Sequence, residues 1–446
     1  MQSGSDIRSE APAEDDPLVA NLKRFQHLLL RGRVLSISGP IIRTRLSGVK
    51  IGDMCQIEGG SDGPIAAEVV AISEDVAMLT PLGDTRGLST WSGVRLCGKP
   101  MIVPCGDGLL GRTVDALGRP LDAKGPVSGR LDEAPIERAP PSPLSRQLIS
   151  KPLSTGVRVI DGLLTLGRGQ RIGIFGGAGA GKSTLLSALI KGSEADVAVI
   201  ALIGERGREV REFVEETLGE DGAARSVVVA ATSDRPALER MKAAATATSI
   251  AEHFSDQGKD VLLVMDSITR FARALREIGL SVGEPPTRRG FPPSVFARLP
   301  VLLERAGPAP RGTITAIYNV LVDSEEDGDP IADEVRGILD GHVILSPKLA
   351  ARGHYPAIDV NRSRSRTMGA VVTKEHQGAA DRIRALLAKH AELEFLIEVG
   401  EYKPGQDELA DEAVQKHSSI VDFLRQRPGE TTSLEETQQW MRKIAG

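Results

Sequence analysis

A glycine-rich run near the middle of the chain has the residue types and spacing of a phosphate-binding loop. It follows the form G-x-x-x-x-G-K-[ST], and its members are Gly176, Gly177, Ala178, Gly179, Ala180, Gly181, Lys182 and Ser183. Glycines let the main chain aim several N–H groups at one anion, and the positive end of the following helix adds to the attraction. Lys182 is expected to reach the β- and γ-phosphates, and the Ser183 hydroxyl to bind Mg²⁺. The run therefore predicts a site for a nucleoside triphosphate.

The segments on both sides of this loop favour the same interpretation. A strand-like apolar run, residues 171–175, precedes the loop, and a run with helical periodicity, residues 183–190, follows it. Strand, loop and helix N-terminus together form the context in which such a loop binds phosphate. This context disfavours the alternative, a glycine-rich turn that binds nothing.

A phosphate loop also needs an acidic residue for the metal ion, and Asp266 is the candidate. It ends the apolar run 261–266, and a buried strand that ends in Asp aims one carboxylate at the Mg²⁺ ligands. Many buried strands end in Asp. The assignment therefore depends on the position of Asp266 downstream of the phosphate loop, in the same region of alternating strands and helices.

Hydrolysis of a triphosphate further needs a group that positions and polarises a water molecule. Glu205 follows the apolar run 197–203 and stands next to Gly204, so we expect it at the same edge of the sheet. The alternative for the charged run 205–209 is a solvated surface cluster. The exit from an apolar strand at the catalytic edge favours a role for Glu205 in hydrolysis.

Length, composition and charge set limits on the kind of protein. The 446 residues correspond to two or three domains of about 150 residues each. The net charge of −5 gives no general electrostatic reason to bind nucleic acid. The chain has no run of about 18 apolar residues and no basic, hydrophobic N-terminal signal, which predicts a cytoplasmic protein. The cysteines, Cys55, Cys97 and Cys105, lack metal-ligand spacing and are interpreted as reduced and structural.

The chain divides into four predicted parts, residues 1–30, 31–104, 105–370 and 371–446. The first is a disordered acidic tail that ends in a short amphipathic helix, which packs on its own domain or docks on a partner or membrane surface. Short β-prone runs between glycine turns make the second part a small β-barrel. In the third, a loop-rich junction precedes alternating strands and helices, which predict a mostly parallel sheet covered by helices. The fourth is helical.

Several further runs, in order along residues 30–440, make the chain resemble the catalytic-subunit family of rotary ATP synthases, and more closely the type III secretion ATPases. Beside the phosphate loop, the runs are residues 152–162, 204–209, 270–277, 283–286, 292–300, 338–342, 353–359 and 365–366. The resemblance implies an α/β fold, with a RecA-like P-loop ATPase core, an N-terminal β-barrel and a C-terminal helical domain. It also implies that ATP and Mg²⁺ are bound.

The resemblance implies a role for each matching residue. Residues 176–184, including Thr184, match the nucleotide-binding loop, and Ser183 and Asp266 match the metal-binding positions. The other matches are Glu205 as the catalytic glutamate, Arg206 as the arginine beside it, Arg270 as an arginine directed at the γ-phosphate, Arg366 as the arginine finger that reaches the nucleotide of the neighbouring subunit, and Tyr355 as a tyrosine near the adenine.

Two departures from the family pattern stand out. Arg362 and Arg364 are extra arginines where the family usually has uncharged residues, so either of them could share the role of Arg366. Pro347 stands where the family commonly has arginine. Because proline fits the first turn of a helix, this change is interpreted as local.

The presence of Glu205 favours a catalytic over a non-catalytic subunit. A nucleic-acid translocase would need a basic, aromatic barrel, and residues 31–104 contain Trp91 as their only aromatic residue. Residues 396–405 resemble the secretion branch rather than the rotary synthases. Together with residues 321–336, they favour an injectisome ATPase over the flagellar export ATPase, which stays the alternative.

The resemblance also implies partners. They are five further copies in a homo-hexamer, a central stalk protein, a peripheral stator or regulator on the N-terminal segment, chaperone–effector complexes, and an export gate at the cytoplasmic face of the inner membrane. Nucleic acid is not among them. The expected activity is ATP hydrolysis that releases chaperones from exported proteins and unfolds them. Residues 283–293 are a candidate pore loop or a solvated connector.

Overall fold

A computed structural model describes residues 31–61, 63–177, 179–322 and 328–446. The chain divides into two compact units after Pro100, and the described part of the first unit begins at Arg31. The predicted tail and amphipathic helix in residues 1–30 lie outside the described residues, as does Ala178. The predicted domain bounds at residues 104 and 370 stay predictions.

The first unit contains a closed antiparallel barrel with the strand order β1-β2-β5-β4-β3-β6. Its strands are β1 (Arg31–Ser38), β2 (Ile41–Arg45), β3 (Met54–Gly60), β4 (Gly63–Ser73), β5 (Val76–Leu82) and β6 (Gly93–Leu96). Apolar side chains such as Val34, Ile57 and Leu79 fill the interior. The predicted β-barrel is confirmed, and the glycine turns between short β-prone runs are its physical origin.

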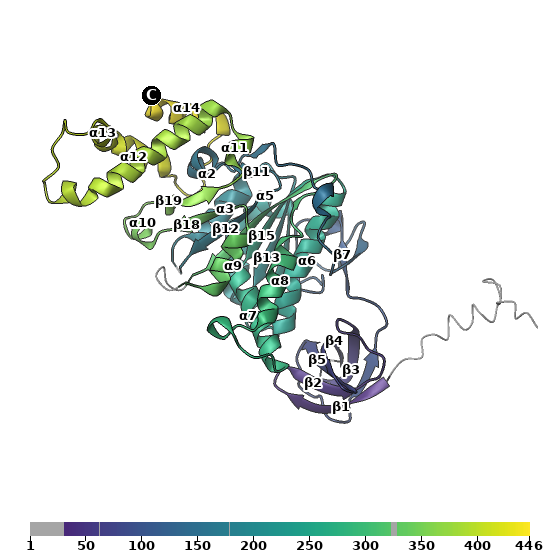
Figure 1. Cartoon of the computed structure of the whole chain (residues 1–446). Coiled ribbons are helices and arrows are strands. Elements are labelled where there is room, and N and C mark those ends of the chain that lie inside the picture. Colours follow the sequence, from purple (N-terminus) through teal and green to yellow (C-terminus); the bar gives the residue numbers. More distant parts are fainter. Residues whose placement is uncertain (1–30, 62, 178, 323–327) are drawn as a thin grey trace, which may run out of the picture. The chain divides into compact units, whose positions relative to one another are not determined.

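The second unit is built on a nine-stranded sheet, counted over the described residues, in the order β19-β18-β12-β17-β15-β13-β14-β8 with β16 paired to β17 (Figure 1). Its strands are β8 (Arg112–Val114), β12 (Arg171–Gly176), β13 (Val197–Ile203), β14 (Ser226–Ala231), β15 (Asp260–Asp266), β16 (Gly307–Pro308), β17 (Thr313–Leu321), β18 (Gly341–Leu345) and β19 (Ile358–Ser365). The pairs from β18 to β8 are parallel, whereas β19 and β16 are antiparallel to their neighbours. Continuous apolar runs suit central strands buried on both faces.

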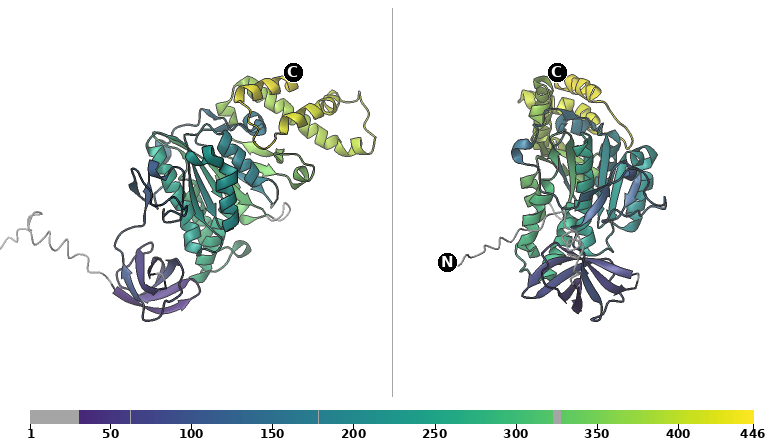
Figure 2. Two further views of the ribbon diagram at one scale, coloured as in Figure 1. Left: turned by 180° about the vertical axis from the view of Figure 1, so that it is seen from behind. Right: turned by 90° about the vertical axis from the view of Figure 1, so that its right-hand side faces the viewer.

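Helices cover the sheet on both sides (Figure 2). They are α2 (Arg158–Leu163), α3 (Lys182–Gly192), α4 (Gly207–Glu212), α5 (Gly219–Ala224), α6 (Ala237–Asp256), α7 (Ile268–Ser281), α8 (Pro293–Leu303), α9 (Pro330–Ile338) and α10 (Pro347–Ala351), with a π-helical turn at Phe213–Leu218 and 3₁₀ turns at Asp107–Leu109, Pro143–Ser145 and Arg288–Gly290. Short strand pairs complete the unit, β7 (Ile102–Cys105) with β9 (Asp132–Pro135) and β10 (Pro152–Leu153) with β11 (Leu166–Gly167). Pro347 occupies the first turn of α10, as predicted.

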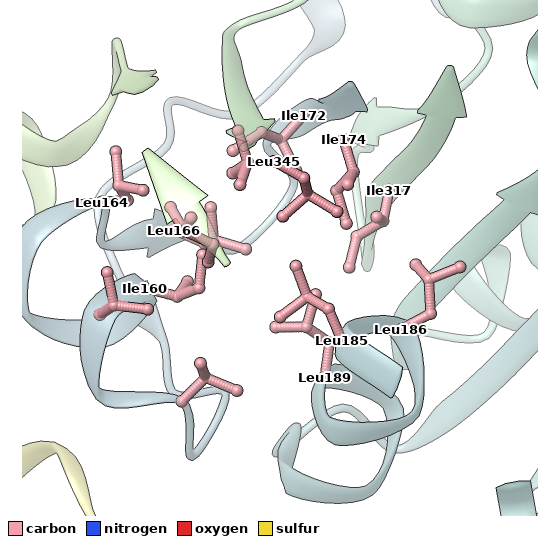
Figure 3. Close-up of a cluster of buried hydrophobic side chains, with 14 of the residues drawn as sticks. Ile160, Leu164, Leu166, Ile172, Ile174, Leu185, Leu186, Leu189, Ile317 and Leu345 are labelled. Atoms are coloured by element: carbon pink, nitrogen blue, oxygen red, sulfur yellow. The ribbon is translucent and has the colours of Figure 1, made fainter. Parts of the chain in front are cut away.

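The apolar side of α3 anchors the helix that follows the phosphate loop. Leu185, Leu186 and Leu189 belong to the same buried cluster as Ile174 of β12 and Ile317 of β17 (Figure 3). Burying each such side chain stabilises the fold by about 1.5–3 kcal/mol relative to leaving it exposed. This packing fixes the N-terminus of α3 against the ends of the strands.

The C-terminal part is helical, as predicted, with α11 (Met368–Val371), α12 (Lys374–Glu398), α13 (Glu408–Leu424) and α14 (Leu434–Ala445). Side chains of these helices share one core with α2. The packing is close at Gly162, where a Cβ atom would lie 2.8 Å from the sulfur of Met441 and 2.9 Å from the ring of Phe423. A glycine at this position therefore lets α13 and α14 approach α2.

The junction at residues 107–143 is more regular than predicted, because β8 joins the sheet beside β14. Arg112 of β8 contacts the loop that follows the strand. Its buried guanidinium pairs with Asp122 at 2.8 Å and donates to the carbonyl oxygens of Gly125 and Pro126. These contacts tie the following loop to the edge strand, and they depend on residues too far apart for a local pattern to reveal.

Candidate active site

Four strands bring their carboxyl ends to one row of the sheet. Gly176 of β12 is opposite Leu321 of β17, Asn319 of β17 is opposite Asp266 of β15, and Asp266 is opposite Leu202 of β13. In parallel sheets, ligands bind outside this edge. The register therefore places the phosphate loop, Asp266 and Glu205, which follows β13, around one space.

The loop has the backbone that the motif requires. Gly179 and Gly181 have φ angles of 76° and 81°, in the left-handed region that favours glycine. Among the described residues, no side chain caps the N-terminus of α3, so the first N–H groups of the helix are available to an anion. Lys182 Nζ donates to the carbonyl oxygens of Gly176 and Gly177 at 2.9 and 2.5 Å, and burial lowers the pKa of its ammonium group.

A pocket of about 860 Å³ opens at this edge and contains most of the predicted site. The predicted residues that line it are Gly179, Gly181, Lys182, Ser183, Thr184, Glu205, Asp266, Arg270 and Tyr355. Gly176, Gly177 and the buried Ala180 lie outside the lining. Their contribution is to the loop backbone, since two of them hold Lys182 through their carbonyl oxygens.

Asp266 and Ser183 fit a magnesium ion. Asp266 Oδ1 accepts a hydrogen bond of 2.6 Å from Asn319 Nδ2, and burial raises the pKa of Asp266. Asn319 Oδ1 is buried without a hydrogen-bond partner among the described residues. Mg²⁺ prefers oxygen ligands and is usually held by one or two carboxylates together with substrate phosphates. A carboxylate, a hydroxyl and a nearby unpaired amide oxygen suit that chemistry.

Arg270 forms an ion pair with Glu205. Arg270 Nη2 donates to Glu205 Oε2 at 3.1 Å, and Arg270 Nε lies 2.9 Å from Glu205 Oε1. Gly204 makes room for this pair, because its φ is 68° and a Cβ atom there would lie 2.9 Å from Arg270 Cδ. The pair fixes the orientation of the Glu205 carboxyl group at the pocket wall.

Burial raises the pKa of Glu205 to about 7. A hydrogen bond from Glu205 to the Glu209 carboxylate and the negative charge of Asp266 act in the same direction, and together they outweigh Arg270. The same hydrogen bond lowers the pKa of Glu209. A general base works best when its pKa lies near the working pH, so this environment suits Glu205 for that role.

We therefore expect the rate of ATP hydrolysis to rise with pH through about 7, as Glu205 loses its proton. In Glu209→Gln, the carboxylate that holds this proton is absent, so the rise should move to lower pH by about one pH unit. Profiles of kcat/KM against pH for wild type and Glu209→Gln measure the shift. Superimposable profiles, or a shift to higher pH, would contradict the assignment.

Arg206 and Arg366 lie outside this pocket. Arg206 is exposed, with Nη1 3.6 Å from Glu209 Oε1. Arg366 is also exposed and follows the edge strand β19, which carries Arg362 and Arg364. The structure thus brings Lys182, Glu205, Asp266 and Arg270 together within one chain but leaves Arg366 apart from them.

The main chain around Arg366 is held firmly although its side chain is exposed. The Arg366 N–H donates to the Asp340 carbonyl oxygen at 2.9 Å. Ser365 Oγ donates to the Thr165 carbonyl oxygen at 3.0 Å, and Thr367 Oγ1 donates to Gln170 Oε1 at 2.6 Å. Hydrogen bonds on both sides therefore fix the point from which Arg366 extends.

Several lining residues escaped the sequence analysis. A Cβ atom on Gly181 would lie 3.3 Å from the ring of Tyr355, and beyond this ring the wall is formed by Gln426, Arg427, Pro428 and Glu430. No local signal connects this C-terminal turn with the pocket. A signal did exist for Asn319, because it is a polar residue inside the otherwise apolar end of β17.

The described residues contain no helix that is long and apolar enough to cross a membrane.

Comparisons with known proteins support the predicted fold. Residues 34–98 match the ATP synthase alpha/beta family β-barrel domain, residues 156–365 match the nucleotide-binding domain of the same family, and residues 372–443 match the T3SS EscN ATPase C-terminal domain. The predicted fold class, a nucleotide-binding α/β core between a β-barrel and a helical C-terminal part, is confirmed.

Full-length relatives point to the same family. The chain is 52% identical to a type 3 secretion system ATPase of Sinorhizobium fredii, with 96% of both chains covered, and 49% identical to a flagellum-specific ATP synthase of Bacillus subtilis, with 91% of this chain and 92% of the relative covered. The assembled ATPase EscN from the type III secretion system of enteropathogenic E. coli superposes with a TM-score of 0.89 at 49% identity, over 93% of this chain and 100% of that one. EscN in complex with its central stalk EscO gives a TM-score of 0.86 at 49% identity, with the same coverage. The chain therefore belongs to the type III secretion system ATPase family.

Proposed function

We propose that this protein hydrolyses ATP as a Mg²⁺-dependent homo-hexamer of a type III secretion apparatus, and that hydrolysis releases chaperones from exported proteins and unfolds those proteins. The observation that carries the proposal is the division of the predicted catalytic groups. Lys182, Glu205 and Asp266 line one pocket, whereas Arg366 projects from the surface outside it. A second copy of the chain would be needed to add the arginine.

Within one subunit, each group has a stated task. The loop N–H groups and Lys182 bind the β- and γ-phosphates. Glu205 in its carboxylate form takes a proton from water as the water oxygen attacks the γ-phosphorus, and the bond to the bridging oxygen of ADP breaks. Arg270 orients Glu205. Ser183 and Asp266 would hold Mg²⁺, which neutralises charge on the phosphate oxygens when bound.

Between subunits, Arg366 would stabilise the charge that develops on the transferred phosphoryl group. An arginine supplied in trans accelerates such reactions by roughly 10³–10⁵-fold. Arg206 pairs with Glu209, and Glu209 is hydrogen-bonded to Glu205, so Arg206 would act on Glu205 indirectly, through Glu209. The likeness to assembled EscN supports the ring, and the complex of EscN with its central stalk supports a stalk partner for this chain.

The remaining partners belong to the same proposal. A stator or regulator would bind the N-terminal segment, and the ring would stand at the export gate on the cytoplasmic face of the inner membrane. Chaperone–effector complexes would bind the C-terminal helices, where Phe395 and Val399 of the α12 end are exposed by 70% and 50%. The exposed Arg288 side chain suits residues 283–293 as a pore loop.

One experiment separates the injectisome from the flagellar branch, to which the Bacillus subtilis relative belongs by name. A strain that lacks the gene is complemented with wild type or with Glu205→Gln, and swimming and released proteins are scored together. The injectisome assignment expects Glu205→Gln cells that swim but lose a set of released proteins. Loss of swimming would instead assign the chain to flagellar export. If both functions survive and respiratory growth fails, the chain acts in a rotary synthase.

A further inference from the structure

One buried arginine holds the turn at residues 426–430, which forms the wall of the proposed nucleotide pocket next to Tyr355. Arg158, at the start of α2, is almost completely buried, with a side-chain exposure of 5%. Its Nε donates to the Phe423 carbonyl oxygen at 3.0 Å, and its two terminal nitrogens donate to the Arg425 carbonyl oxygen and to the Glu430 carboxylate. A single guanidinium thus joins three points of a segment more than two hundred residues away.

Hydrogen bonds of Gln426 hold this wall in place. Gln426 Oε1 accepts from the Arg158 N–H at 2.9 Å, and Gln426 Nε2 donates to the carbonyl oxygens of Gly156 and Glu430, both at 2.7 Å. The Gln426 N–H donates to the Tyr355 carbonyl oxygen at 2.9 Å. The turn is therefore tied to Arg158 on one side and to the tyrosine beside the phosphate loop on the other.

Of the turn residues that line the pocket, Arg427 and Glu430 are the charged ones. Arg427 lines the pocket, and its positive charge acts on the Glu430 carboxylate. Its N–H donates to Glu430 Oε2 at 3.0 Å, while the other oxygen of that carboxylate pairs with Arg158. The Arg158 guanidinium lowers the pKa of Glu430 and keeps it ionised. The position of Arg427 thus depends on Arg158 through Glu430.

The same arginine reaches the C-terminal helices. Its guanidinium carbon lies 4.9 Å from the ring centroid of Trp440 on α14, a distance at which a cation and an aromatic face attract. Trp440 in turn meets the Phe423 ring of α13 edge to face, with a centroid separation of 5.8 Å. Arg158 therefore stands between the pocket wall and the core of the helical C-terminal part.

We infer that Arg158 is a positioning residue for the base and ribose end of the nucleotide, and that it links this end to α13 and α14. It touches neither the phosphates nor the reacting atoms. By fixing residues 426–430, Arg158 would hold Arg427 and Tyr355 in position to contact the nucleoside. Because Trp440 contacts Arg158, a movement of this wall would change the environment of the Trp440 ring. The inference rests on the ATP site proposed above.

The test compares full-length wild type with Arg158→Lys, at protein concentrations where the wild-type ring is assembled. Lysine keeps the charge, but its three donors share one nitrogen and cannot span acceptors that Arg158 reaches from three separate nitrogens. We expect KM for ATP to rise about tenfold with kcat nearly unchanged. The inhibition constant of inorganic tripolyphosphate, which has no base or ribose, should stay constant because the phosphate loop is intact. Equal weakening of ATP and tripolyphosphate, or an unchanged KM, would overturn the inference.

Trp440 provides a second readout. The chain has two tryptophans, so Trp91→Phe leaves Trp440 as the single reporter. In that background ADP should change the emission and tripolyphosphate should not, and Arg158→Lys should abolish the ADP response. An ADP response that persists in Arg158→Lys overturns the link to the C-terminal helices.

Two further variants keep the outcomes distinct. Arg112→Lys alters another buried arginine that holds a carboxylate and two carbonyl oxygens. None of its partners lines this pocket, so the KM of this variant should remain that of wild type. An equal rise in KM there would reduce Arg158 to a general structural role. Lys182→Ala should weaken both ATP and tripolyphosphate. If it weakens neither, the proposed ATP site itself is wrong, whatever Arg158→Lys shows.

Discussion

Replacing Glu205 with Gln should lower kcat for ATP hydrolysis by roughly 10²–10⁴-fold, the usual contribution of a positioned general base. Glutamine has the size of glutamate and can still accept from Arg270, but it cannot take the proton of the attacking water. The phosphate loop is unchanged, so the dissociation constant for ATP should stay within about twofold of wild type. Steady-state turnover and calorimetric titration with ATP measure the two quantities.

The matched control is Glu212→Gln. Glu212 lines the same pocket, but its exposed carboxylate pairs with Arg208 rather than with Arg270. Because exposed ion pairs of this kind contribute little, we expect nearly wild-type turnover. If Glu205→Gln kept more than a tenth of the activity, or if Glu212→Gln were equally inactive, another group would have to be the base.

Replacing Arg366 with Ala should cost roughly 10³–10⁵-fold in turnover once the ring is assembled. The expected reason is that the variant loses the positive charge that Arg366 is proposed to place at the γ-phosphate of the neighbouring subunit. Wild-type activity per chain should therefore climb with protein concentration as rings form, and that of Arg366→Ala should stay low throughout. Turnover over a dilution series that spans assembly measures both.

A mixture of two inactive variants decides whether the arginine acts in trans. In a ring that contains Glu205→Gln and Arg366→Ala subunits, some interfaces combine an intact Glu205 with an intact Arg366. The mixture should then be far more active than either variant alone. An inactive mixture would place the arginine in cis. Arg364→Ala is the control for the neighbouring exposed arginine of β19, and it should leave turnover nearly unchanged if Arg366 carries the role alone.

The features that could be predicted from the sequence are those that depend on short, continuous runs of residues. The phosphate loop, Asp266 and Glu205 each stand where an apolar strand ends, and parallel strands bring such ends together. The sequence pattern therefore predicted that these residues lie close together. In the structure, Lys182, Glu205 and Asp266 line one pocket. Their individual chemical roles stay predictions until the variants above are measured.

The pocket wall at residues 426–430 could not be predicted in this way. Gln426 and Glu430 reach the pocket because α13 and α14 pack on α2, and this packing depends on the shape of a core shared by distant segments. Likewise, Arg112 of β8 is held by a loop that has no regular pattern of its own. Glu209 was visible as a charge beside Glu205, but its hydrogen bond to that residue is a result of the helix geometry after β13.

The anchoring of Ser365 and Thr367 on either side of Arg366 has a mechanical consequence. Because the main chain there is clamped to Thr165, Gln170 and Asp340, the guanidinium can adjust its reach only through its own side-chain torsions. In the proposed ring, the gap between two adjacent subunits would then set whether Arg366 reaches the phosphate. The turnover rate would therefore depend on the spacing between adjacent subunits of the ring. A stalk or cargo that pulls one interface open would slow that interface, and one that presses it shut would start the next hydrolysis.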